Sequence, residues 1–249
     1  MSSPAVSQPS AATTADFHTA SPEGPSAMPL VHASAVSSVV IAGAGGLGVE
    51  LYDYLQAEAL CGGPVVAGFI DDRPGKVPDG IDLPHLGPIR QFRPASHQAV
   101  LVAIAATQAR QDVLSWLLQI GIEVPLYVHS TALVSPSARL GVGALIFPFT
   151  VVSRGALVED GVVANVFSGI GHGSRAGACS VLSPHAVLNG NATVGPRCFL
   201  GTRATLYPGV TIGADCVVDS HTGVSANAKD RQFITAGTYQ ITARRIRDQ

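Results

Sequence analysis

The sequence predicts an α/β domain followed by a parallel β-solenoid. Two observations predict this order: a strand, glycine turn, helix and strand pattern near the start, and an unbroken six-residue repeat of apolar residues in the second half. A chain of 249 residues with 47% apolar residues and a net charge of −2 is ordinary for a folded protein of one or two domains. We expect a tail at 1–37, the α/β domain at 38–127, and the solenoid with a C-terminal extension at 128–249.

The first 37 residues are rich in Ser, Ala, Pro and Thr and contain few large apolar residues. Such a segment buries too little surface to offset the entropy of ordering, so we expect a disordered tail. The tail has neither the basic start nor the continuous apolar stretch of a signal peptide, so we expect a cytoplasmic protein.

The α/β domain is predicted from alternating strand and helix patterns. The predicted elements are strands at 38–42, 65–70 and 100–105 and helices at 49–60 and 107–119. The first strand runs directly into a glycine turn, Gly43-Ala44-Gly45-Gly46-Leu47-Gly48, and the second strand ends in Asp71-Asp72. This order of elements predicts a three-layered α/β domain.

The glycine turn and the two aspartates predict a nucleotide site. Gly45 and Gly46 would let backbone N–H groups approach a phosphate at the start of a helix. Asp71 and Asp72 lie where a ribose or sugar hydroxyl could be bound. A glycine-rich turn also occurs as a purely structural tight turn, and this alternative stays open.

The solenoid is predicted from a period of six, which neither a helix nor an ordinary strand produces. Each sixth residue from 128 to 224 is aliphatic or alanine: Val128, Val134, Leu140, Ile146, Val152, Val158, Ala164, Ile170, Ala176, Leu182, Leu188, Val194, Leu200, Leu206, Ile212, Val218 and Val224. The residue two places before each of them, from Ala132 onward, is small. We interpret each hexad as one flat side of a coil, so that three hexads close a coil and residues eighteen apart stack.

Charge and cysteine usage exclude several classes of protein. Only two of the 15 basic residues are Lys, and the arginines are scattered, so the chain has no cluster of positive charge that could bind nucleic acid. No feature of the sequence supports membrane binding either. None of the four cysteines forms a C-x-x-C pair typical of metal sites. Cys198 and Cys216 occupy small-residue positions one coil apart, so packing explains them, and a disulfide between the stacked coils is the less favoured alternative.

Histidines are the informative polar residues of the solenoid. His172 lies one coil before Gly190 and one coil after Arg154, and in a groove between two solenoids it could act as a general base. A surface histidine at a coil corner is the alternative. His185, Arg203 and His221 share one position on three successive coils, where they could bind an anion or simply face solvent or a neighbouring subunit.

Several motifs together resemble one family. They are the order of the two domains, the run His129-Ser130-Thr131-Ala132-Leu133-Val134-Ser135-Pro136, Asn165 seven residues before His172, and Asn189-Gly190-Asn191 before Val194-Gly195. Over residues 38–234 the chain is similar to the hexapeptide-repeat acyltransferases related to sialic acid O-acetyltransferases and UDP-4-amino-sugar N-acetyltransferases. This resemblance implies a Rossmann-like domain followed by a left-handed parallel β-helix, an exception to the usual right-handed crossover.

The same resemblance implies an acyl-CoA-dependent acyltransferase that moves an acetyl group from acetyl-CoA to an amine or hydroxyl of a nucleotide-linked sugar. It also implies a homotrimer with active sites between adjacent solenoids, and no metal. The site residues that we expect are catalytic His172, Asn165 and His185; CoA-binding Gly190, Gly173 and Pro208; and substrate-binding Gly45, Gly46, Asp71 and Asp72.

Three positions depart from the family pattern. Gly173 replaces the acidic residue that usually follows the base, Val181 replaces a second histidine, and Gly237-Thr238-Tyr239-Gln240 replaces a Gly-x-Pro-Ala-Lys type segment. One hypothesis is that His185 takes over part of the lost role, within its own or a neighbouring subunit. The departures leave open a non-catalytic binding protein and an acyltransferase for a non-sugar amine in specialised metabolism. A third alternative, a solenoid metalloenzyme of the carbonic anhydrase type, needs histidines from neighbouring subunits to converge.

Overall fold

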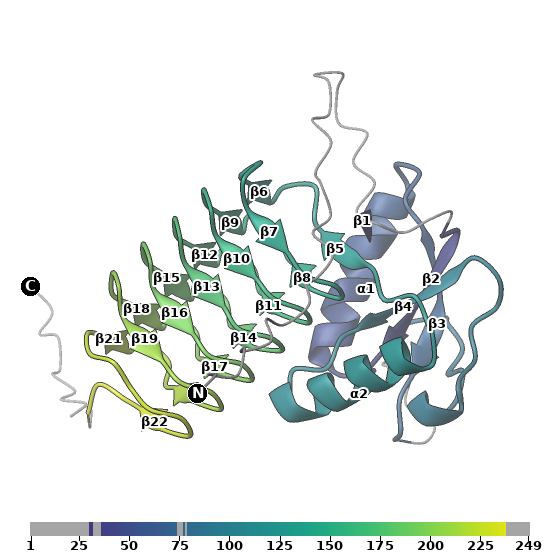
Figure 1. Cartoon of the computed structure of the whole chain (residues 1–249). Helices are drawn as coiled ribbons and strands as arrows, with labels where there is room; N and C mark the ends of the chain where they lie inside the picture. Colours follow the sequence, from purple (N-terminus) through teal and green to yellow (C-terminus); the bar gives the residue numbers. More distant parts are fainter. Residues whose placement is uncertain (1–29, 32–35, 74–76, 78, 238–249) are drawn as a thin grey trace, which may run out of the picture.

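The computed structural model of the protein describes residues 30–31, 36–73, 77 and 79–237 (Figure 1). Most of the expected tail at 1–37 lies outside these residues, as do residues 238–249 of the C-terminal extension. Within the expected tail, Leu30–Val31 forms strand β1, which pairs antiparallel with β5 at Leu126–Val128. The segment expected as a tail therefore contributes one short strand to the fold.

The α/β unit contains a three-stranded parallel sheet in the order β3-β2-β4. Its elements are β2 (Ser38–Ala42), α1 (Gly46–Ala59), β3 (Val65–Ile70), the short 3₁₀ helix η1 (Ile89–Gln91), β4 (Gln98–Val102) and α2 (Thr107–Gln119). Helix α1 begins three residues before its predicted start at 49, and β4 ends three residues before its predicted end at 105. Within the described ranges, no helix is both long enough and apolar enough to cross a membrane.

The two helices cover opposite faces of this sheet. Ile41 on one face packs in a cluster with Leu51 and Leu55 of α1. Its neighbour Val40 points to the other face and packs in a cluster with Leu117 of α2. Because successive residues of a strand point to opposite faces, this alternation produces three layers.

The second part of the chain is a parallel β-solenoid, as the hexads predict, and it has about six coils. Its front sheet, which faces the α/β unit, contains β5, β8 (Leu145–Ile146), β11 (Val163–Ala164), β14 (Val181–Leu182), β17 (Phe199–Leu200), β20 (Val217–Val218) and β22 (Phe233–Ile234). A second sheet, which we call the groove sheet, contains β6 (Leu133–Val134), β9 (Val151–Val152), β12 (Gly169–Ile170), β15 (Val187–Leu188), β18 (Thr205–Leu206) and β21 (Gly223–Val224). The back sheet contains β7 (Arg139–Leu140), β10 (Leu157–Val158), β13 (Arg175–Ala176), β16 (Thr193–Val194) and β19 (Thr211–Ile212).

Stacking at a spacing of eighteen residues holds the solenoid together. Ile170, for example, pairs with Val152 on one side and Leu188 on the other. From Ile146 to Val224 the aliphatic hexad residues are buried in one continuous core. Val128 and Val134 are only partly buried, because the first coil has no complete coil before it to cover its end.

A fully buried arginine joins the two parts of the protein. Arg110 of α2 donates hydrogen bonds to the backbone carbonyls of Val102 at the end of β4, and of Gly143 and Gly161 in the solenoid. Its side chain has no exposed surface, and burial lowers the pKa of Arg110 to about 10. The guanidinium therefore remains charged at neutral pH and fastens α2, β4 and two coils at one point.

A second junction is formed by Glu58, near the end of α1. Its carboxylate accepts hydrogen bonds from the Tyr127 hydroxyl and from the Ser130 backbone N–H, both at 3.2 Å, and lies 4.0 Å from the His129 ring. Burial raises the pKa of Glu58 and lowers the pKa of His129. The first coil of the solenoid is thus tied to α1 through a buried titratable group.

Glu58→Gln should change how the free energy of unfolding depends on pH. A carboxyl group whose folded-state pKa is raised adds stability below its ordinary pKa near 4.5, and this stability is lost as the pH rises through the folded-state pKa. The variant should therefore match the wild type in mild acid and exceed its stability at pH 8. Urea unfolding at several pH values measures this difference. A variant that is less stable than the wild type at pH 8 would contradict the assignment.

Candidate functional site

The first of two candidate pockets lies at the glycine turn of the α/β unit. It has a volume of about 320 Å³ and is lined by Gly43, Gly45, Gly46, Leu47, Asp71, Asp72, Arg73, Ile89, Ala103, Ile104 and Ala105. All four residues expected on the substrate side, Gly45, Gly46, Asp71 and Asp72, are among them. The carboxyl ends of β2, β3 and β4 therefore meet at this glycine-turn pocket, as expected for a parallel sheet.

The glycine turn is shaped by close backbone packing. A Cβ atom at Gly48 would overlap the carbonyl oxygen of Gly43, and Gly43 itself has a φ of +108°. Among the described residues, no acceptor contacts the backbone N–H groups of Gly45, Gly46 and Leu47. These N–H groups at the start of α1 are available to an anion.

The two aspartates of the glycine-turn pocket differ in what they contact. Asp71 is buried and accepts hydrogen bonds from the Ala44 and Arg73 backbone N–H groups and from the Arg73 guanidinium. These bonds, led by those from the Arg73 side chain, hold the pKa of Asp71 far below its usual range. Asp72 is exposed and accepts one hydrogen bond from the Ile89 N–H at 2.9 Å. Asp72 is thus the aspartate with acceptor capacity left for a ligand.

The second candidate pocket is an open groove on the groove sheet. Its volume is about 440 Å³, and it is lined by Val151, Ser153, Gly169, Ile170, Gly171, His172, Val187, Leu188, Asn189, Gly190 and Pro208. His172, Gly190 and Pro208 are thus brought together, at one coil corner and eighteen residues apart. Gly173, Asn165 and His185 do not line this groove, and neither does Arg154, although its neighbour Ser153 does.

His172 and Gly190 are in direct contact. A Cβ atom at Gly190 would overlap the imidazole ring of His172, so only glycine leaves room for the ring in this position. No hydrogen-bond partner of the His172 ring is found among the described residues, in agreement with Gly173 replacing an acidic neighbour. The backbone N–H of Gly190 likewise has no acceptor in the described chain, so a donor and a possible base lie side by side in the groove.

Asn165 and His185 lie at the corner between the front sheet and the groove sheet. The Asn165 side chain accepts a hydrogen bond from the Val166 N–H at 2.7 Å. His185 stacks on Phe167 with ring centroids 5.0 Å apart, and Phe167 stacks on Phe149 at 4.9 Å. We call Phe149, Phe167 and His185 the corner ladder.

The corner ladder extends the column of His185, Arg203 and His221 predicted from the sequence. All five residues have a φ near +60°, a left-handed conformation that is unfavourable for residues other than glycine. Phe149 and Phe167 keep about half of their surface exposed. Sequence reasoning considered only polar residues off the apolar hexad position and so missed the two phenylalanines, although the spacing of eighteen already aligned them with His185.

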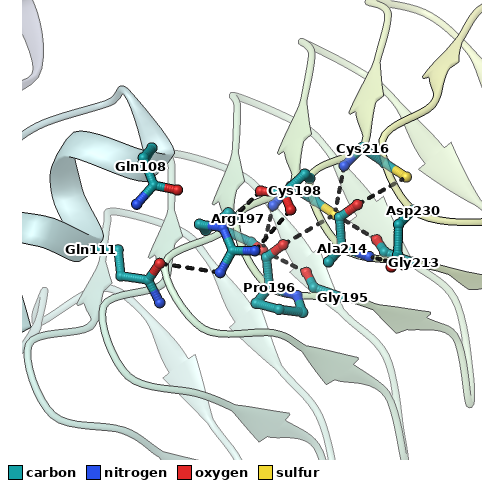
Figure 2. A network of polar contacts seen from close by, with 12 residues as sticks. Gln108, Gln111, Gly195, Pro196, Arg197, Cys198, Gly213, Ala214, Cys216 and Asp230 are labelled. Carbon is teal, nitrogen blue, oxygen red and sulfur yellow. Dashed lines mark hydrogen bonds and ion pairs between the residues drawn. The ribbon is translucent and has the colours of Figure 1, made fainter.

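The described residues hold no group of three or more His, Cys, Asp or Glu side chains that could bind a metal ion. All four cysteines are free thiols, and burial raises the pKa of Cys198 to about 12. Figure 2 shows the Cys198 and Cys216 thiols within the polar network around Arg197, which donates to Gln111 of α2 and to both carboxylate oxygens of Asp215. This network is structural, because it links α2 to successive coils of the solenoid.

A hexapeptide solenoid with a histidine-lined groove, joined to an α/β unit with a glycine-turn pocket, defines the class of hexapeptide-repeat acyltransferases. No protein-family model matches the sequence. The chain is 28% identical to the GDP-perosamine N-acetyltransferase of Escherichia coli O157:H7 over 173 residues, which is 68% of this chain and 78% of that enzyme.

Solved structures show the same relationship. PerB from Caulobacter crescentus, solved with CoA and GDP-perosamine, is 31% identical, with a TM-score of 0.70 over 78% of this chain and 91% of PerB. The acetyltransferase domain of PglB from Neisseria gonorrhoeae, solved with acetyl coenzyme A, is 27% identical, with a TM-score of 0.70 over 78% of this chain and 94% of that domain. The chain belongs to the hexapeptide-repeat sugar N-acetyltransferase family and is an acetyltransferase.

Proposed function

We propose that this protein transfers an acetyl group from acetyl-CoA to the amine of a nucleotide-linked sugar. The observation that carries the proposal is the pairing of His172 with the free N–H of Gly190 in the groove. The relatives solved with CoA and GDP-perosamine support the choice of donor and acceptor. In this proposal the solenoid is a left-handed β-helix, the α/β unit is a Rossmann-like nucleotide domain, and the two occupy 128–249 and 38–127.

His172 acts in this proposal as the general base. Its imidazole takes a proton from the sugar amine while the amine nitrogen attacks the thioester carbonyl carbon. The Gly190 N–H donates to the oxyanion that forms on the carbonyl oxygen. When the C–S bond breaks, the sulfur leaves as a thiolate and receives the proton held by His172, so the products are an amide and free CoA. The mechanism needs no covalent enzyme intermediate.

The other expected residues are assigned by their places in the two pockets. Gly190 and Pro208 would contact the CoA side of the groove, with Gly173 next to His172 at the same corner. Gly45, Gly46 and Asp72 would contact the nucleotide in the glycine-turn pocket, while Asp71 shapes that pocket.

We also propose that the protein is a homotrimer with its active sites between solenoids. The groove of one subunit is open, and the side chains of Leu133 and Val151 on the same sheet are exposed apolar surface. A second copy that covers this surface would bring its own corner, with Asn165 and His185, toward His172. In this arrangement Asn165 and His185, which do not line the groove of their own subunit, would act in the active site of the neighbouring subunit.

Acetyl transfer can be measured directly. We expect the full chain to release free thiol from acetyl-CoA when GDP-perosamine or a UDP-4-amino-sugar is present, and the acceptor to gain one acetyl group in its mass spectrum. Omitting the acceptor is the control, because thiol release without it would be thioester hydrolysis. If a panel of nucleotide-linked amino sugars gave neither thiol release nor acetylated product, the proposed acceptor class would be wrong.

A further inference from the structure

Arg73 is the only basic side chain among the residues that line the glycine-turn pocket. The sequence pattern identified the preceding Asp71 and Asp72 as site residues, but it did not identify Arg73. More than half of its side-chain surface is exposed. The other lining residues are glycines, aliphatic residues and two aspartates, so an anionic group of a ligand would find its only positive side-chain partner in this lining at Arg73.

The guanidinium of Arg73 is held in one orientation by Asp71. Its Nε donates to one carboxylate oxygen at 3.0 Å, and its Nη2 donates to the other at 2.8 Å. The same Nη2 lies 3.7 Å from the position of a Cβ atom at Gly45, so the guanidinium lies over the glycine turn. Its Nη1 has no acceptor in the described chain. A fixed guanidinium with free N–H groups therefore lies beside the free N–H groups of the turn.

Asp71 has no acceptor capacity left for a substrate hydroxyl. One of its oxygens accepts from the Arg73 backbone N–H and from Nε, and the other accepts from the Ala44 N–H and from Nη2. Two hydrogen bonds on each oxygen account for the lone-pair sites of a carboxylate. The interpretation of Asp71 as a ribose or sugar ligand therefore does not fit its contacts.

We infer that Arg73 binds a phosphate of the nucleotide together with the glycine-turn N–H groups, and that Asp71 is a positioning residue that acts through Arg73. This inference rests on the proposed function and deepens it. The planar guanidinium fits phosphate oxygens with two parallel hydrogen bonds, which an ammonium group does not reproduce. Asp72, with an unused carboxylate oxygen, lies in the same pocket for a hydroxyl or a base N–H group.

The test compares ligands with and without phosphate. The affinities of GDP, guanosine, UDP and uridine are measured by calorimetry for the full chain and for Arg73→Gln. We expect the variant to bind the preferred nucleoside diphosphate about 10-fold more weakly, because a charge-assisted contact is lost, and to bind the matching nucleoside with unchanged affinity. The loss should shrink at high salt. Arg73→Lys should recover only part of the affinity, and Arg139→Gln, which removes an exposed cation of the back sheet, should change nothing.

A double-mutant cycle tests the role of Asp71. Asp71→Asn should weaken diphosphate binding in the wild-type background and cause little further loss in the Arg73→Gln background. If Asp71→Asn weakened nucleoside binding in both backgrounds, Asp71 would contact the ligand directly and its positioning role would be wrong. Equal affinity of Arg73→Gln and wild type for the diphosphate would overturn the inference and leave the proposed function standing, provided that acetyl transfer to the nucleotide sugar is observed. If the wild type bound neither GDP nor UDP and acetylated no nucleotide-linked amino sugar, both the inference and the proposed function would be wrong.

Discussion

His172→Ala should lower the turnover number for acetyl transfer by roughly 10²- to 10⁴-fold, the contribution typical of a positioned general base. His172 lines the groove, packs against Gly190 and has no hydrogen-bond partner within the described residues. Its removal therefore costs little folding free energy and takes away the one side chain in the groove that can accept a proton from an amine. Thiol release at saturating acetyl-CoA measures the change.

Two controls separate catalysis from binding and folding. Arg139→Ala alters an exposed residue of the back sheet outside the groove and should keep the wild-type rate. CoA affinity should be similar in His172→Ala and the wild type, because the expected CoA contacts are backbone groups and Pro208. A His172→Ala protein that retains wild-type turnover would show that the base lies elsewhere.

Arg110→Ala should have the largest effect on stability, lowering the free energy of unfolding by about 3 kcal/mol or more. The substitution leaves the buried carbonyls of Val102, Gly143 and Gly161 without their donor and opens a cavity between α2 and the solenoid. Each unsatisfied buried carbonyl costs about 1–3 kcal/mol, so the sum exceeds what surface substitutions produce.

Urea unfolding at neutral pH measures the effect of Arg110→Ala. Arg139→Ala, an exposed arginine on the back sheet, is the matched control and should change the free energy of unfolding by less than about 0.5 kcal/mol. Arg110→Lys should recover part of the loss, because an ammonium group can reach some of the carbonyls. Equal stability of Arg110→Ala and Arg139→Ala would contradict the role of Arg110 as the joint between the two parts.

The repeat predicted the solenoid well because its signal is redundant. Every coil needs an aliphatic residue at each sixth position to fill the shared core, so the same signal recurs along the whole solenoid. Few folds other than stacked coils bury residues with this period. Helix α1 was predicted to start too late, since Gly46 and Gly48 have low helix propensity. The structure places them in the first turn because the backbone at Gly48 packs directly against Gly43.

The candidate site was only partly predictable. The spacing of eighteen placed His172 beside Gly190, and the structure brings the two together. The same spacing could not show that the Arg154 side chain stays out of the groove, because a coil position fixes a backbone place and not the direction of a long side chain. The saturation of Asp71 by four donors is a three-dimensional property, so the sequence pattern treated Asp71 and Asp72 as equivalent.

In the proposed mechanism, acetyl transfer occurs at His172 and Gly190 while the nucleotide is held at the glycine turn. A crystal structure of the protein with CoA and GDP-perosamine tests it most directly. We expect the CoA sulfur to lie in the groove beside the Gly190 N–H, with the sugar amine within hydrogen-bond distance of the His172 ring and the diphosphate at Arg73. A complex in which the sulfur or the sugar amine lies away from His172 would contradict it.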